Sequence, residues 1–179
     1  MRRSRLLWVG KALLLLVVAV ALQTLIVSRV SVLGVTADLF LVFTVVVAMG
    51  RGSLQGAVFG FFAGLIADVA FLQPLGVRSL IYVLAGYFVG MFVARFGMVT
   101  AWGVLFLAGG TSFLAQFVFG LFQYIIGPQA DFLTMLGTQM LPEAILDGLI
   151  AVPVYALLVR LRLIRARGVS PAGSRGAAE

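Results

Sequence analysis

Residues 51–68 read RGSLQGAVFGFFAGLIAD, with glycine or a carboxylate at every fourth position from 52 to 68. Residues four apart lie on nearly the same face of a helix, so Gly56, Gly60 and Gly64 form a flat stripe that ends at Asp68. In lipid, helices associate where small residues let their backbones touch. The stretch therefore predicts a membrane helix packed tightly against another, with an acid at one end of the contact.

The composition is that of a polytopic membrane protein. Of the 179 residues, 63% are hydrophobic and 11% are charged, against about 25% charged in a soluble domain. The chain has no Cys and no His, which excludes disulfides, thiol nucleophiles and the usual general base. No glycine motif for nucleotides is present, and no cofactor is expected. The net charge of +7 comes from residues at the ends of apolar runs, which set topology rather than bind nucleic acid.

The apolar runs predict an all-α fold, a six-helix transmembrane bundle forming one domain over residues 1–159. The second span is short: Ala37 to Gly50 covers roughly 20 Å as a helix, less than the ~30 Å hydrocarbon core. We expect it either to rely on neighbouring helices or to sit in locally thinned membrane. The expected spans are about 10–28, 37–50, 53–69, 79–95, 99–126 and 132–159, followed by a basic, disordered cytoplasmic tail at 160–179.

The basic residues predict the orientation. Six spans put Arg29 and Arg78 on one side and all other basic residues on the other, which is a strong positive-inside signal that places both termini in the cytoplasm. A competing interpretation takes the N-terminus, with Ala19-Val20-Ala21, as a cleaved signal peptide that leaves five spans. The cytoplasmic set is Arg2, Arg3, Arg5, Lys11, Arg51, Arg95, Arg160, Arg162, Arg165, Arg167 and Arg175.

Polar residues from five segments are expected at one depth. Counted from the cytoplasmic boundary at about 1.5 Å per residue, each lies about 20–25 Å away, in the outer part of the membrane. An unpaired acid at the bilayer centre costs roughly 2.5–3.5 kcal/mol. We therefore expect Arg78 to pair with Asp68 or Glu143, and Arg29 to pair with Asp38. The cluster comprises Asp38, Asp68, Arg78, Gln116, Glu143 and Asp147.

Three interpretations of this cluster stay open, because an intramembrane charge is a functional suspect but also fixes helix register. It is an internal ion-pair network, a polar pocket for a ligand or for a partner's helix, or a set of side chains exposed at the membrane interface. The small residues are expected to pack helices within the chain rather than to form a dimer face, since six helices share many contacts. The expected packing seam is Gly52, Gly56, Gly60, Gly64, Gly86 and Gly90.

Residues 37–90 resemble the MreD family of bacterial rod shape-determining membrane proteins, and a weaker likeness extends over about residues 10–165. Ala37 is a departure, because the family often has Pro there. The resemblance rests on Ala37-Asp38-Leu39, Arg51-Gly52 with Gly56, Gly60-Phe61, Gly64-Leu65 and Asp68, Pro74-Leu75-Gly76, Tyr82 and Gly86-Tyr87.

The resemblance implies a non-enzymatic scaffold of the elongation machinery in the bacterial cytoplasmic membrane. Its expected partners are MreC and, directly or through MreC, the filament protein MreB, the glycosyltransferase RodA and a class B penicillin-binding protein. The family fold is also similar to the S components of energy-coupling-factor vitamin transporters.

Two other functions are weighed against the scaffold. A ligand-binding S component would use the outer polar cluster, but the outward loops are short and carry no Trp to cover a ligand. The first span also lacks the Ala-x-x-x-Ala pair with which such proteins dock their transport partner. A membrane enzyme would use Glu143 and Asp147 for acid-base work, yet no nucleophile or metal set accompanies them.

Overall fold

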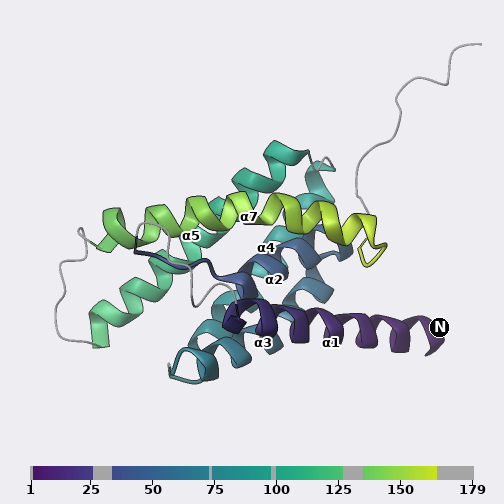
Figure 1. Ribbon diagram of the computed structural model, residues 1–179, viewed down its shortest axis with the longest axis horizontal. Helices are drawn as coiled ribbons and strands as arrows, with labels where there is room; N and C mark the ends of the chain where they lie inside the picture. Colours follow the sequence, from purple (N-terminus) through teal and green to yellow (C-terminus); the bar gives the residue numbers. More distant parts are fainter. Residues whose placement is uncertain (1, 26–33, 73, 98–99, 127–134, 165–179) are drawn as a thin grey trace, which may run out of the picture.

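The computed structural model describes residues 2–25, 34–72, 74–97, 100–126 and 135–164 (Figure 1). These residues form six helices and no strand, which confirms the predicted all-helical fold. Five of the helices are long and apolar enough to cross a membrane. They are α1 (Arg2–Leu25), α2 (Leu39–Arg51), α3 (Ser53–Ala70), α4 (Val77–Phe96), α5 (Ala101–Ile126) and α7 (Leu141–Arg160), which begins with a π-helical turn, η2 (Leu136–Met140).

Some expectations fall on residues that the structure does not describe. Arg29 lies outside the described residues, as does the tail beyond residue 164. The end of the first predicted span at 26–28 and the start of the last at 132–134 also lie outside them.

The short helix α2 is the core of the bundle (Figure 1). Every residue from Leu39 to Gly50 is buried, and α2 contacts α1, α3, α4, α5 and α7. A helix that is apolar on all sides is stable only when other elements surround it. Because its neighbours cover it, α2 needs no lipid-spanning length. The structure shows support by neighbouring helices, the first of the two expectations for this short span.

Helices α3 and α4 pack backbone to backbone. A Cβ on Gly56 would lie 2.8 Å from the carbonyl oxygen of Gly86, and one on Gly64 would meet the backbone of Ser79. Gly60 likewise abuts the carbonyl of Tyr82, and Gly90 abuts Ser53. The glycines therefore set the distance between these two antiparallel helices, because any side chain would force them apart.

Gly52 makes the turn between α2 and α3. Its φ of +105° lies in a region that only glycine adopts readily. Its backbone N–H donates to the carbonyl of Ala48 at 2.8 Å, which closes α2 before α3 starts one residue later. The two helices therefore form a hairpin without a loop.

The end of the bundle that carries Arg51, which we call the basal end, is closed by the residues after α7. Ile164 is buried and packs over Gly50. Arg51 donates to the carbonyl of Leu163 at 2.8 Å, and Lys11 donates to the carbonyl of Arg162 at 3.1 Å. These two cations, expected from the sequence only as topology signals, also hold the end of α7 against α1 and α2.

Candidate functional site

Asp38 connects three parts of the chain at the opposite end of α2. It is buried, and its Oδ1 accepts the backbone N–H of Leu41 at 3.2 Å, which caps α2. Its Oδ2 accepts from Arg78 at 2.9 Å and from the hydroxyl of Tyr82, both on α4. Its own backbone N–H donates to Oδ1 of Asp147 on α7 at 2.9 Å.

Arg78 is fixed by aromatic rings as well as by Asp38. Its guanidinium carbon lies 4.6 Å from the ring centre of Phe71 and 4.6 Å from that of Phe119. A cation between two aromatic faces is attracted by both ring quadrupoles. The charge is therefore held by protein groups on three sides, although 14% of the side chain is exposed.

The carboxylate of Asp68 accepts hydrogen bonds from backbone N–H groups rather than from the guanidinium of Arg78. Its two oxygens accept the N–H of Gly76 at 2.7 Å and the N–H of Arg78 at 3.1 Å. These donors belong to the start of α4, so the last turn of α3 caps the next helix. The expected pairing of Arg78 with Asp68 or Glu143 is wrong for the guanidinium, which binds Asp38 instead. A count of residues along each helix gives depth, but it does not give the direction in which a side chain points.

Gln23 of α1 is part of the same site, and the sequence analysis missed it. Its amide nitrogen donates to the carbonyl of Ala37 at 3.0 Å, and its amide oxygen accepts the N–H of Leu39 at 3.0 Å. The side chain thus satisfies two backbone groups at the start of α2, where no helix bond serves them. The one available signal was that Gln23 is the only carboxamide in its apolar run.

Two polar pairs join α5 to α7. Ser112 donates to Oδ2 of Asp147 at 2.5 Å, and one turn further along each helix Gln116 donates to Oε1 of Glu143. Gly109 continues this line, because a Cβ there would lie 3.0 Å from the carbonyl of Ala144. Ser112 and Asp147 are buried, whereas Gln116 and Glu143 are half-buried.

We call the residues joined in this way the polar layer. All six sequence-predicted cluster residues belong to it, since Gln116 lines a small cavity together with Asp38 and Arg78. That cavity has a volume of about 10 Å³, which is room for about one water molecule. Among the described residues, no group of His, Cys, Asp or Glu has the arrangement of a metal site. The members are Gln23, Asp38, Asp68, Arg78, Tyr82, Ser112, Gln116, Glu143 and Asp147.

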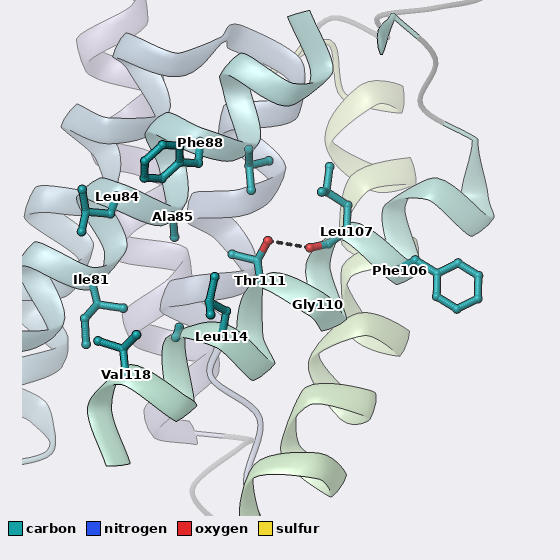
Figure 2. A pocket seen from close by; sticks show the side chains of 12 residues that line it. Ile81, Leu84, Ala85, Phe88, Phe106, Leu107, Gly110, Thr111, Leu114 and Val118 are labelled. Carbon is teal, nitrogen blue, oxygen red and sulfur yellow. Dashed lines mark hydrogen bonds between the residues drawn. The ribbon is translucent and has the colours of Figure 1, made fainter. Parts of the chain in front are cut away.

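An apolar groove lies beside the polar layer, between α4 and α5 (Figure 2). Its volume is about 330 Å³. Figure 2 shows Leu84 and Phe88 of α4 on one side and Leu114 of α5 facing them, with Thr111 and then Gly110 beyond Leu114 toward Phe106. Thr111 is the one polar side chain of the lining, and its hydroxyl donates to the carbonyl of Leu107 at 2.6 Å. The groove therefore presents an uncharged surface with its polar group already satisfied.

Comparison with family models gives a match over most of the chain. The model of a family described as rod shape-determining protein MreD matches residues 3–163. That span contains every described helix except the first residue of α1. No curated protein and no solved structure matches the chain.

Proposed function

Because this chain belongs to the MreD family of rod shape-determining proteins, we propose that it is a non-enzymatic membrane scaffold of the machinery that elongates rod-shaped bacterial cells. In this role it binds MreC. Through MreC or directly, it connects to MreB, to RodA and to a class B penicillin-binding protein. The complex couples peptidoglycan synthesis to cell shape. The family match over residues 3–163 is the observation that carries this proposal.

The hydrogen bonds within the polar layer favour a scaffold rather than an enzyme. A general acid or base must reach a substrate proton within hydrogen-bond distance. Asp147 instead accepts from Asp38 and from Ser112 and is fully buried. Glu143 accepts from Gln116 on the neighbouring helix. The two carboxylates thus act as links between helices, which suits a bundle that keeps one shape while partners assemble on it.

The size of the polar cavity disfavours the vitamin-binding alternative. Small-molecule sites in proteins measure about 300–1,000 Å³. The cavity between Asp38, Arg78 and Gln116 measures about 10 Å³, so a vitamin has no room there unless the helices separate. The hydrogen bonds of Asp38 to three helices oppose that separation, since each broken bond leaves a polar group unsatisfied in an apolar medium.

In the proposed orientation the basal end faces the cytoplasm. Arg51, Arg95 and Arg160 lie at that end of their helices, and Lys11 of α1 binds the carbonyl of Arg162 there. The positive-inside rule places such residues on the cytoplasmic side. The polar layer then lies in the outer half of the cytoplasmic membrane, near the periplasmic domain that MreC carries. The groove between α4 and α5 faces lipid at the same time, open to a membrane helix of a partner.

The test is affinity purification of the tagged chain from its host in a gentle detergent, with mass spectrometry of proteins and small molecules in the same sample. The proposal predicts recovery of a single-span periplasmic protein together with cell-wall synthases. It also predicts that depletion of the chain turns rod-shaped cells round. Recovery of ATP-binding-cassette subunits or of a stoichiometric vitamin would overturn it.

A further inference from the structure

Helix α7 ends in a turn that has an arginine where glycine is usual. The N–H of Leu163 donates to the carbonyl of Leu158 at 3.0 Å, and the N–H of Arg162 donates to the carbonyl of Val159 at 3.0 Å. This pair of bonds is a Schellman cap, whose C′ residue adopts a left-handed backbone and is usually Gly. Arg162 is that residue here, with a φ of +55°. A side chain in this conformation costs stability, so the turn itself does not explain an arginine.

A second cation holds this turn in place. Lys11 of α1 donates from Nζ to the carbonyl of Arg162 at 3.1 Å, and Arg51 donates to the next carbonyl, that of Leu163, at 2.8 Å. The end of α7 and the first half of α1 accordingly lie at the same side of the molecule (Figure 1). An ammonium has three N–H donors, and this bond of Lys11 uses one. The side chain of Arg162 is exposed, so two cations from opposite ends of the chain lie beside each other at the surface.

The described residues place negative charge only at the other end of the bundle. Their four acids are Asp38, Asp68, Glu143 and Asp147, and all belong to the polar layer. The exposed arginines of the basal end are Arg95, Arg160 and Arg162, and no described acid neutralises them. Clustered charge of one sign attracts ions of the opposite sign. The basal end therefore favours an anionic ligand.

Two tryptophans place these cations at the depth of lipid headgroups. Trp8 lines a small cavity at the basal end together with Lys11 and Ile164. Trp102 lies in the first turn of α5, at the same end of the bundle, and is 71% exposed. Trp is enriched at the boundary between hydrocarbon and headgroups. Clustered cations at this boundary bind the headgroups of anionic lipids.

We propose that Lys11 and Arg162 form a binding site for the phosphate of an anionic phospholipid, in the leaflet that the basal end faces. The planar guanidinium of Arg162 suits two oxygens of one phosphate, and the ammonium of Lys11 adds a second charge. The bound lipid links the end of α7 to α1, because these two cations come from the two helices. The inference concerns the membrane and not the proposed protein partners, so its failure leaves the scaffold proposal standing.

The first experiment measures lipid retention by the full chain. Wild type, Arg162→Gln and Arg95→Gln are purified in a neutral detergent, given equal amounts of phosphatidylglycerol and phosphatidylcholine, and studied by native mass spectrometry. Arg95→Gln is the matched control, because it also removes one exposed cation of the basal end. We expect wild type to retain phosphatidylglycerol preferentially, Arg162→Gln to lower that retention about fivefold, and Arg95→Gln to leave it unchanged. Equal losses in the two variants, or no preference in wild type, would overturn the proposal, because the cations would then form no site.

The second experiment separates lipid binding from the fold. Arg162→Gly relieves the left-handed backbone but removes the cation. Without lipid, we expect its thermal midpoint in neutral detergent to lie about 2–4 °C above that of wild type. Added phosphatidylglycerol should raise the midpoint of wild type, since a ligand of the folded state stabilises it, and should leave that of Arg162→Gly nearly unchanged. A full lipid-induced rise in Arg162→Gly would refute the site. So would a midpoint below wild type without lipid, because the side chain of Arg162 would then serve the fold alone.

Inorganic phosphate distinguishes a lipid from a soluble anion. It offers similar oxygens without the acyl chains that keep a lipid at the membrane boundary. We expect phosphate, added to wild type at the concentration used for the lipid, to leave the thermal midpoint unchanged. A rise as large as that from phosphatidylglycerol, and absent from Arg162→Gln, would assign the site to a soluble anion and contradict the proposal.

Discussion

The carboxylate of Asp38 and the guanidinium of Arg78 lie 2.9 Å apart, although 40 positions separate them in the chain. Asp38 caps α2 with its other oxygen, and the backbone N–H of Arg78 is held by Asp68. The pair therefore ties the start of the central helix to the start of α4. An unpaired charge at the bilayer centre costs roughly 2.5–3.5 kcal/mol. The ion pair therefore favours a fold in which the start of α2 lies beside the start of α4.

Gly86→Ala should separate α3 from α4. The added Cβ would collide with the backbone carbonyl of Gly56, which moves only if the helix moves, and such overpacking costs about 1–3 kcal/mol. Gly110→Ala is the matched control: it meets open space and should stabilise the helix by up to about 1 kcal/mol. Thermal unfolding of the purified variants in detergent measures both. Equal thermal midpoints for Gly86→Ala and Gly110→Ala would refute the close packing of α3 against α4 at Gly86.

Gln23→Leu should release α1 from the segment before α2. The change leaves the carbonyl of Ala37 and the N–H of Leu39 without their partner, at a cost of about 1–3 kcal/mol for each buried group. We expect faster hydrogen exchange at Leu39 and its neighbours, measured by mass spectrometry. Thr24→Val is the control, since among the described residues the Thr24 hydroxyl bonds to the carbonyls of Val20 and Ala21, both within α1. If hydrogen exchange in Gln23→Leu matched that of wild type, the two hydrogen bonds of Gln23 would not be what holds this segment.

Asp68→Ala should loosen the start of α4. It removes the acceptor of two backbone N–H groups, those of Gly76 and Arg78, and loss of a helix cap costs about 0.5–2 kcal/mol. Asp68→Asn keeps one carbonyl oxygen and should lie between Ala and wild type in thermal unfolding. If Asn and Ala were equally destabilised, the charge of Asp68 rather than its backbone bonds would be the stabilising feature.

The sequence predicted the six helices because long apolar runs punctuated by charge leave few other solutions in lipid. Counting 1.5 Å per residue put Asp38, Arg78 and Asp147 at one depth, and hydrogen bonds join them in the structure. The same count carries no information on direction around each helix axis, so the pairing of Arg78 was wrong. Neutral groups were harder still: Gln23 adds little to the cost of a span, and its being the only carboxamide in its apolar run does not say which groups it binds.

Two other features needed three-dimensional contacts. The run Leu39–Gly50 is apolar on every side, which suits both a lipid-exposed span and a central helix, and only its contacts show that it is central. The helical glycines look alike in the sequence. Their surroundings separate Gly86, where a Cβ would collide with the backbone of Gly56, from Gly110, where a Cβ would meet no atom of the described residues within 4 Å.

The Asp38–Arg78 pair stabilises the fold, and in the proposed function the folded bundle is what rod shape requires. The decisive measurement takes Arg78→Met, Asp38→Asn and the double variant, and determines the thermal midpoint and the rod shape of complemented cells for each. Breaking one side of a buried pair costs about 3–5 kcal/mol, whereas replacing both sides is often near neutral. We predict that Arg78→Met loses stability and rod shape, and that the double variant regains both together. A double variant as stable as wild type whose cells stay round would contradict the claim.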